Sequence, residues 1–330
     1  MACAVIQRVR RTIRRHGLLP PGSRVLVGLS GGSDSVALTR LLLDLADHGG
    51  FAVIGLAHFN HGLRPSAGAD EAFCRDFAQR VGLPFECGHG AVRDYAAAES
   101  LSIEDAARRL RYAFLERAAA AQRADRIAVG HTQDDQAETF LLKLMRGAGL
   151  RGLGGIYPQK GTLIRPLLDV TRSDLRAYLR SRSDAWTDDE TNDDLANPRN
   201  RIRHRVLPEL DRALGGSTKP AIARAAALIR EDALWLDALA DEQFLKLARQ
   251  TECGLELDVG LLAETPAPLR RRVVLRALRA TAADREIGLD HVESVVALLN
   301  SAHGGVDVPG THVELRRGML VLLQQRGGLR

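Results

Sequence analysis

The residues best suited to chemistry lie in the hexapeptide SGGSDS, residues 30–35, which begins at the last residue of the apolar stretch RVLVGLS. A strand that turns into a helix presents several unpaired N–H groups, and the helix dipole favours a negative charge there. Gly31 and Gly32 let the backbone approach phosphate oxygens, because no Cβ stands in the way. The pattern therefore predicts a phosphate-binding turn. Further hydroxyl donors come from three serines, Ser30, Ser33 and Ser35.

Asp34 lies inside this turn, and the lysine of a Walker-type phosphate loop has no counterpart here. A carboxylate repels a bare phosphate, so Asp34 is explained either by Mg²⁺ that bridges it to phosphates or by a capping role at the helix start. No G-x-x-x-x-G-K-[ST] motif occurs in the sequence, which argues against a Walker-type site. An S-G-G turn can also join a strand to a helix without any ligand, but the ordered hexapeptide favours binding.

A second reactive stretch is GHTQDDQAET, residues 130–139, at the end of the apolar segment RIAVGH. Asp134 and Glu138 are four residues apart and Asp135 and Glu138 are three apart, so at least two carboxylates share one helix face. A solvated acidic helix start is the alternative, since the dipole favours acidic residues there. If both stretches follow strands of one parallel sheet, the carboxylates point toward the same cleft as the phosphate turn.

Strands and helices alternate over the first ~145 residues, which predicts an α/β fold with a parallel sheet and helices on both faces. The expected strands are 24–30, 51–60, 83–90 and 126–131, and the expected helices are 34–48, 69–82, 100–125 and 134–147. Ser102 with Asp105, and Thr171 with Asp174, predict capped helix starts.

Beyond residue 145 the pattern changes. Residues 146–161 are glycine-rich and predict a flexible loop, and residues 184–210 pass from an acidic loop into a basic helix. We expect a catalytic domain over 1–212, a linker over 213–220 and a mainly helical domain over 221–330. That last domain ends in a β-hairpin or small sheet with a turn at Pro309–Gly310.

The composition fits a globular chain of 330 residues with a net charge of +5. The positive charge predicts an anionic partner, although most of the 46 basic residues are arginine, so each arginine is weak evidence by itself. The cysteines Cys3, Cys74, Cys87 and Cys253 form no C-x-x-C pair. This spacing suggests no disulfide framework and no zinc or iron–sulfur site, and we expect a reducing cytoplasm.

No apolar run approaches the ~18–20 residues that a membrane helix needs, so no membrane partner is expected. The N-terminal segment 1–17 is rich in arginine and free of acidic residues, which a mitochondrial presequence also shows. Because Val5, Val9 and Ile13 fall on one helical face shortly before the first strand, we favour an amphipathic first helix of the fold.

The segment AHFNHGLR, residues 57–64, carries His58 and His61 three residues apart. A metal pair is one interpretation, but no further ligand cluster lies near in the sequence. The position just past the second expected strand favours a site for the adenine or ribose of a nucleotide.

The hexapeptide resembles the PP-loop of the N-type ATP pyrophosphatases, whose fold is that of the adenine nucleotide alpha hydrolases. Six segments occur in the order of the tRNA(Ile)-lysidine synthetase family, and the resemblance runs from about residue 22 to 212. They are SGGSDSVAL, AHFNHGLR, EDAARRLRYAFL, GHTQDDQAET, RPLLDVTRSDLRAYL and RNRIRHRVLPEL. The resemblance implies a C-terminal helical tRNA-binding domain, here in a short form.

The resemblance also implies the reaction. ATP adenylates the C2 oxygen of the wobble cytidine in the CAU anticodon of tRNA(Ile) and pyrophosphate leaves. The ε-amine of free L-lysine then attacks C2 and AMP leaves, which gives lysidine and changes codon reading from AUG to AUA and identity from Met to Ile. The chemistry is sound, because adenylation turns a poor electrophile into one with a leaving group.

The resemblance implies that residues of this chain at the matching positions have the roles known for the family. ATP contacts are expected from Ser30, Gly31, Gly32, Ser33, Asp34, Ser35, His58 and His131, with Mg²⁺ on Asp34. Catalysis and lysine binding are expected from Asp34, Asp134, Asp135, Glu138 and Arg111, and the residue that accepts the proton stays open. Substrate or tRNA contacts are expected from Arg108, Arg111, Arg199, Arg201, Arg203 and Arg205, with a solvated basic surface as the alternative. A homodimer is one option for the assembly.

Two other functions compete with this interpretation. A PP-loop 2-thiolation enzyme usually needs paired cysteines, and the sequence has none. A non-catalytic ATP-binding module has no use for the carboxylates of residues 134–138 or for the long C-terminal region.

Overall fold

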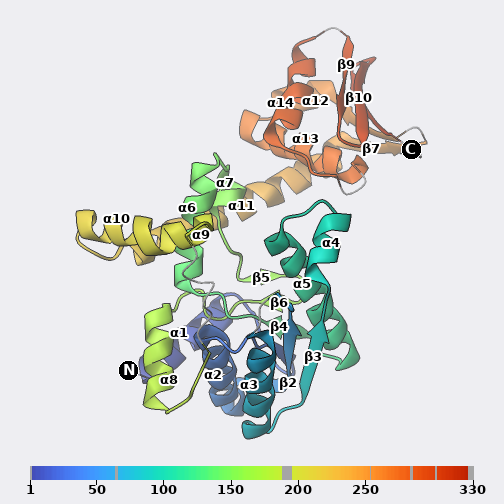
Figure 1. Cartoon of the computed structure of the whole chain (residues 1–330). Coiled ribbons are helices and arrows are strands. Elements are labelled where there is room, and N and C mark those ends of the chain that lie inside the picture. Colours follow the sequence, from blue (N-terminus) through green and yellow to red (C-terminus); the bar gives the residue numbers. More distant parts are fainter. Residues whose placement is uncertain are drawn as a thin grey trace. The chain divides into compact units, whose positions relative to one another are not determined.

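The computed structural model describes residues 2–63, 66–187, 195–252, 254–282, 285–301 and 303–325. The chain divides into two compact units, Met1–Arg230 and Glu231–Arg330 (Figure 1). The division falls inside helix α11, Thr218–Leu247. The domain limits expected from the sequence, including the linker at 213–220, stay a prediction. Cys253 and most of the expected acidic loop, residues 188–194, lie outside the described residues.

A six-stranded sheet forms the centre of the first unit, in the order β3-β2-β1-β4-β6-β5. Its strands are β1 Arg24–Gly28, β2 Ala52–Asn60, β3 Phe85–His89, β4 Arg126–Ala128, β5 Gln159–Lys160 and β6 Leu163–Ile164. All neighbouring pairs are parallel except β5 with β6. The chain runs from β1 outward to β3 and then returns to place β4 on the other side of β1, so the strand order reverses between β1 and β4.

Alternate residues of β1 explain why both faces of the sheet are covered. Val25 and Val27 pack in one core cluster with helices α1, α2, α3 and α8, whereas Leu26 packs in a second cluster with α4 and α5. Successive side chains of a strand point to opposite faces, so a strand buried on both faces is apolar throughout. The predicted parallel sheet with helices on both faces is confirmed (Figure 1).

The helices of the first unit are α1 Ala2–Arg15, α2 Ser33–Gly49, α3 Ala67–Arg80, α4 Val92–Ala98, α5 Ile103–Ala121, α6 Gln133–Met145, α7 Leu150–Leu153, α8 Arg172–Ser181, α9 Pro198–Arg201, the π-helix η2 Ile202–Val206 and α10 Leu207–Leu214. Side chains that cap the helix start are found at four helices of the first unit, α5, α6, α8 and α9. Ser102 accepts a hydrogen bond from the N–H of Asp105, and Thr171 from that of Asp174, as predicted. The predicted first helix is confirmed, with Val5 and Val9 buried. The glycine-rich segment 146–161 is not wholly a loop, because it contains α7 and β5.

The second unit has its own core and a five-stranded antiparallel sheet, in the order β7-β8-β11-β10-β9. Its elements are β7 Ala248–Thr251, β8 Gly254–Asp258, α12 Val259–Glu264, α13 Ala267–Thr281, α14 Leu289–Ala297, η3 Leu298–Asn300, β9 Gly304–Val308, β10 Thr311–Arg316 and β11 Met319–Gln324. The predicted terminal β element is confirmed. The expected mainly helical domain over 221–330 did not include β7 and β8, which follow α11. Within the described residues no helix is both long enough and apolar enough to cross a bilayer.

Candidate functional site

The turn after β1 has the form of an anion site. Helix α2 begins at Ser33 with Gly32 as its N-cap, and no side chain caps it. A helix start without a capping side chain leaves its first N–H groups for a ligand, and the helix dipole adds positive potential there. The hydroxyl of Ser35 accepts a hydrogen bond from the N–H of Ser30 at 3.1 Å and donates to the carbonyl of Gly32 at 3.0 Å. These bonds fix the loop over residues 30–35 before any ligand arrives.

Two glycines allow the close approaches that this loop requires. Gly31 has φ +89°, and a Cβ there would lie 2.7 Å from the hydroxyl oxygen of Thr187. A Cβ on Gly130, just after β4, would lie 3.1 Å from the carbonyl carbon of Asp34. The segment after β4 therefore packs directly against the phosphate-binding loop, at the point where the strand order reverses.

Helix α6 carries the predicted carboxylates and is held by a capping box. Thr132 is its N-cap and accepts from the N–H of Asp135, while one oxygen of Asp135 accepts from the N–H of Thr132 at 2.8 Å. The box fixes Asp135 at the first turn of the helix. Asp134, Asp135 and Glu138 are all buried, and the side chain of Glu138 is 0% exposed.

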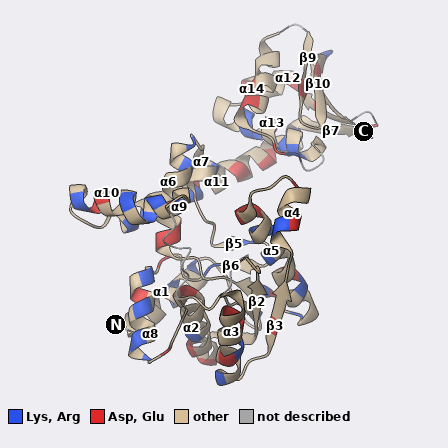
Figure 2. Ribbon diagram, viewed as in Figure 1, with Lys and Arg blue, Asp and Glu red and all other residues tan. Residues whose placement is uncertain are grey.

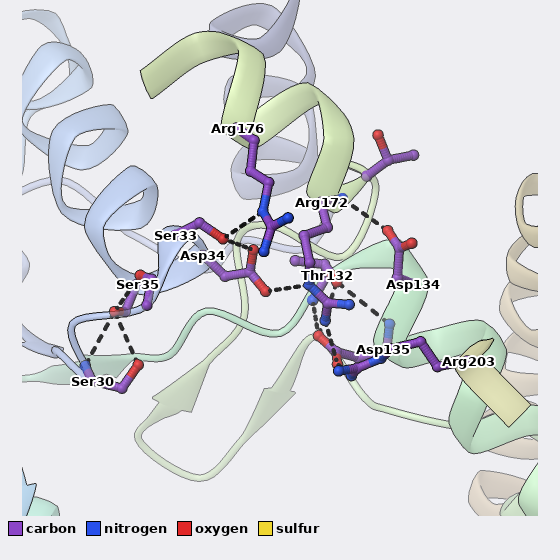
Figure 3. Close-up of polar contacts among 12 residues, drawn as sticks. Ser30, Ser33, Asp34, Ser35, Thr132, Asp134, Asp135, Arg172, Arg176 and Arg203 are labelled. Carbon is purple, nitrogen blue, oxygen red and sulfur yellow. Dashed lines mark hydrogen bonds and ion pairs between the residues drawn. The ribbon is translucent and has the colours of Figure 1, made fainter. Parts of the chain in front are cut away.

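Arg172, at the first turn of α8, joins the phosphate-binding loop to these carboxylates (Figure 3). Its Nε lies 3.0 Å from Oδ2 of Asp34, and its Nη2 lies 3.2 Å from Oδ1 of Asp135. Its backbone N–H donates to Oδ2 of Asp134 at 2.8 Å. One residue thus contacts acidic groups from both stretches that the sequence singled out.

Other basic residues pair with the carboxylates of α6. Arg199 Nε and Arg203 Nε donate to the two oxygens of Glu138 at 2.7 and 2.6 Å. The ammonium of Lys219 lies 2.7 Å from Oδ1 of Asp134. Burying a carboxylate is costly unless it is paired and hydrogen-bonded, and these contacts meet that requirement. Before substrates bind, the four carboxylates are balanced by internal cations.

Burial raises and the paired cations lower the pKa of both aspartates, and the balance differs between them. Burial raises the pKa of Asp135, but Arg199, Arg172 and His131 outweigh it and hold the pKa at about 2. Asp34 has its pKa raised by burial, a shift that Arg172 only partly offsets and that Asp135 reinforces. Asp135 is therefore a poor proton acceptor at neutral pH in this state.

The histidines predicted to contact ATP lie close to the loop, and both are neutral at pH 7. Nδ1 of His58 lies 2.9 Å from the carbonyl oxygen of Leu29, so that nitrogen carries the proton and supports the strand that ends in the loop. Burial lowers the pKa of His58. Burial also lowers the pKa of His131, to about 3, with Arg165 and Arg111 adding to the effect. Each imidazole can offer a hydrogen bond to a nucleotide but no positive charge.

The arginines predicted to contact substrate or RNA divide into three groups. Arg108 and Arg111 lie on α5, with guanidinium groups 5.4 and 5.3 Å from the ring centre of Tyr112. Arg199 and Arg203 point inward to Glu138. Two others are exposed on the surface of α9 and η2, Arg201 and Arg205. Figure 2 shows Lys and Arg gathered along this α9–α10 segment.

Sequence reasoning missed Arg172, Arg176 and Lys219. Arg176 Nε donates to the hydroxyl of Ser33 at 3.4 Å (Figure 3). Arg172 and Arg176 lie in the segment RPLLDVTRSDLRAYL, which was recognised, but nothing in that pattern separates them from the other arginines. Lys219 was assigned to the linker, and only the fold brings it to α6, 85 residues away in the sequence.

The site fits a nucleotide triphosphate with Mg²⁺. The unpaired amides of the loop and its serines suit phosphate oxygens, and Gly31 leaves the backbone accessible. The Asp34 carboxylate is partly exposed beside these amides and is a hard oxygen donor of the kind that Mg²⁺ prefers. Mg²⁺ is usually held by one or two carboxylates together with substrate phosphates, which one aspartate in this position satisfies.

Comparisons with known proteins agree with this geometry. A family model described as a PP-loop domain matches residues 3–210. A tRNA(Ile)-lysidine synthase of Geobacter sulfurreducens is 41% identical over 303 residues, which is 90% of this chain and 64% of that protein. This chain therefore spans less than two thirds of the length of that relative. A tRNA(Ile)-lysidine synthase of Leifsonia xyli is 38% identical over 306 residues, covering 92% of this chain and 90% of that protein.

A solved structure shares the fold. The U34-tRNA thiolase NcsA from Methanococcus maripaludis aligns with a TM-score of 0.58 at 20% identity, over 69% of this chain and 79% of that one. Identity at this level shows a common fold and nothing about the reaction.

Proposed function

The chain belongs to the tRNA(Ile)-lysidine synthase family, and from that premise we propose that it joins free L-lysine to C2 of the wobble cytidine in the CAU anticodon of tRNA(Ile). ATP is consumed and AMP and pyrophosphate are released. The observation that carries the proposal is the contact of Arg172 with both Asp34 of the phosphate-binding loop and Asp135 of α6. A phosphate site and a carboxylate site in contact are what a reaction needs when it uses ATP to activate one substrate for attack by an amine.

The phosphate-binding loop holds the pyrophosphate half of ATP in this proposal. The amides of the α2 start and the hydroxyls of Ser30 and Ser33 donate to the β- and γ-phosphates. Asp34 would hold Mg²⁺, which would neutralise part of the charge of these phosphates. Because the amides and hydroxyls of the loop hold the pyrophosphate half as it leaves, the loop favours cleavage next to the α-phosphorus.

In the first step the C2 oxygen of the cytidine attacks the α-phosphorus, a P–O bond forms, and pyrophosphate leaves. Negative charge spreads over the α-phosphoryl oxygens as the bond changes. In this proposal Arg172, which is 20% exposed and held by Asp34 and Asp135, donates to those oxygens. The base must leave the anticodon stack to reach the site, which costs less in a loop than in a duplex.

In the second step the ε-amine of lysine attacks C2, and AMP leaves with the oxygen that it activated. The amine is protonated near neutral pH, so it must lose a proton before it attacks. The α6 carboxylates Asp134, Asp135 and Glu138 attract the ammonium and orient it. Because the pKa of Asp135 is about 2, the proton goes to another group or to water.

Substrate lysine has to compete with a cation that already occupies the carboxylates. Four basic side chains contact these carboxylates, and Lys219 is the most exposed of them, at 32%. Like the group of the substrate, its charged group is an ammonium. Displacing Lys219 from Asp134 therefore costs less free energy than displacing Arg199 or Arg203 from the buried Glu138.

The RNA is held by the exposed arginines Arg201 and Arg205 and by Arg108 on α5. Contacts from these groups to phosphates make tRNA binding fall steeply as salt rises. A cytoplasmic location follows from the tRNA substrate.

The proposal is tested with isotopically labelled lysine, ATP and a tRNA(Ile) transcript with a CAU anticodon. We expect a labelled nucleoside, heavier than cytidine by lysine minus water, after digestion and mass spectrometry. The methionine tRNA with the same anticodon is the control substrate. A product that carries sulfur instead, or ATP consumption without any change in the RNA, contradicts the proposal.

A further inference from the structure

A group of side chains outside this site has the composition of a metal centre. Glu71 of α3 lies beside Cys87 and His89 of β3, and one ligand atom from each falls within 4.8 Å of the others. Nε2 of His89 lies 2.9 Å from Oε2 of Glu71 and 4.0 Å from Sγ of Cys87. None of the three takes part in the contacts of the phosphate-binding loop or of α6 described above.

The fold explains why these three meet. Cys87 and His89 are two residues apart on one strand, so both side chains point to the same face of the sheet. Gly88, between them, faces the other way, because a Cβ there would lie 2.3 Å from the ring of Phe114 in the opposite core. Helix α3 covers the face that Cys87 and His89 occupy, and it brings Glu71 over the edge strand.

The spacing is close to that of a tetrahedral zinc site. Zn–S of about 2.3 Å and Zn–N or Zn–O of about 2.0–2.1 Å place neighbouring ligand atoms about 3.4–3.6 Å apart. The His89–Glu71 distance of 2.9 Å has to open and the Cys87–His89 distance of 4.0 Å has to close, each by about half an ångström, the scale of a small rotation of side chains.

The carboxylate of Glu71 is oriented by hydrogen bonds from two further side chains. Nδ2 of Asn60, at the end of β2, donates to Oε2 at 3.1 Å, and Nη2 of Arg75 lies 3.0 Å from Oε1. Metal-binding carboxylates are commonly held by hydrogen bonds of this kind. Asn60 also pairs with His89 in the β2–β3 register, so the ligands and their supports form one layer.

We propose that Glu71, Cys87 and His89 bind one Zn²⁺ ion, which clips α3 to the edge strand β3, with water as the fourth ligand. The donor set of a thiolate, an imidazole and a carboxylate suits Zn²⁺ and is wrong for Mg²⁺ or Ca²⁺, which prefer oxygen ligands alone. His89 has a side chain that is 64% exposed, so the fourth position opens to solvent. The clip fixes the end of β2 next to the proposed nucleotide site, through Asn60.

A second cysteine and histidine lie nearby and provide a matched control. Sγ of Cys74 lies 3.4 Å from Nδ1 of His58, but that nitrogen is already bonded to the carbonyl of Leu29. Cys74 is one turn along α3 from Glu71 and is fully buried. A variant of Cys74 therefore shows whether metal binding depends on Cys87 in particular or on any cysteine of this region.

Co²⁺ titration of the full chain, stripped of metal by a chelator, tests the proposal. We expect one Co²⁺ per chain, with a thiolate-to-cobalt charge-transfer band and the d–d bands of a four-coordinate ion, and we expect Zn²⁺ to displace it. Cys87→Ser and His89→Ala remove the band, and Glu71→Gln weakens binding at least tenfold. Cys74→Ala and the surface variant Cys3→Ser keep it.

A wild-type chain without the band overturns the proposal, and so does a band that persists in Cys87→Ser. Circular dichroism shows whether each variant folds. Because Cys87→Ser changes a single atom, its comparison with the wild type still tests the proposal if another variant fails to fold. Zn²⁺ should raise the Tm of the wild type and leave that of Cys87→Ser unchanged. No RNA or ATP is present, so the outcome is independent of the proposed reaction.

Discussion

The phosphate-binding loop and the helix α6 face one another, yet their charges are handled in opposite ways. The loop over residues 30–35 keeps the amides of a helix start available, and no side chain caps them. The acidic groups of α6 all have partners, from Arg172, Arg199, Arg203 and Lys219. An anionic ligand can therefore enter a prepared site, whereas a cationic ligand has to displace a cation already in place. The difference predicts that ATP binding is more robust to mutation of α6 than lysine use is.

Replacing Asp34 tests the loop side and carries the largest expected effect. Asp34→Ala removes the carboxylate proposed to hold Mg²⁺ and one partner of Arg172, so we expect pyrophosphate release to fall by roughly 10³-fold or more. Asp47→Ala, an exposed change on the same helix, is the control and should keep full activity. Substantial pyrophosphate release by Asp34→Ala would remove this residue from the ATP site.

Replacing Glu138 tests the other side. Glu138→Ala leaves Arg199 and Arg203 without their main partner in a buried place, so we expect a loss of about 3–5 kcal/mol in the free energy of unfolding. Lysine use should fall far more than ATP binding. Urea denaturation and the KM for each substrate measure both effects. If ATP turnover drops as far as it does in Asp34→Ala, the division of roles between loop and helix is wrong.

Arg172 is the link between the two regions, and its planar shape matters. Arg172→Lys keeps the charge but cannot contact Asp34 and Asp135 together, so we expect kcat to fall by roughly 10²-fold with little change in the KM for ATP. Arg180→Lys, on the exposed face of the same helix, should behave as the wild type. Equal activity of Arg172→Lys and the wild type would show that positive charge alone suffices.

The stability of the folded chain at low pH should depend on the charge of Asp135. Its pKa is about 2 in the folded chain against 3.8 as the reference, so its charged form contributes about 2 kcal/mol of stability above pH 4. Because the folded pKa is the lower one, this contribution disappears as the pH falls from about 4 to 2. Urea denaturation across that range should give a shallower pH dependence for Asp135→Asn than for the wild type. Parallel pH dependences would contradict the paired state of Asp135.

Lys219 gives the smallest expected effect and the finest test of the comparison. Lys219→Met removes the internal ammonium from Asp134, so we expect the KM for lysine to fall about twofold to fivefold, with the KM for ATP unchanged. Lys246→Met, in the last turn of the same helix, is the control. A higher KM for lysine in Lys219→Met would mean that Lys219 supports the site and does not compete for it.

Structural features that depend on residues close together in the sequence were predictable. The loop at 30–35, the carboxylate spacing on α6 and the caps at Ser102 and Thr171 all depend on residues a few positions apart. The strand alternation of β1 to β4 follows from apolar runs between helical periods. Short-range patterns of this kind predicted the α/β fold of the first unit.

Features that depend on distant contacts were not predictable. Arg172 meets Asp34 across 138 positions, and in a chain so rich in arginine nothing distinguishes it beforehand. Glu71 and His89 are 18 positions apart and lie on different elements, so their meeting depends on how α3 packs on β3. Strands β7 and β8 were missed because they follow a 30-residue helix without an intervening turn signal.

The central claim is that the loop at 30–35 holds the pyrophosphate half of ATP while the AMP half passes to the RNA base. It is tested most directly with ATP labelled at the α-phosphate and tRNA(Ile), with lysine left out. We predict that the label becomes attached to the RNA with release of one pyrophosphate, and that adding lysine frees it as AMP. Conversion of the label to ADP, or its failure to reach the RNA while ATP is consumed, would contradict the account.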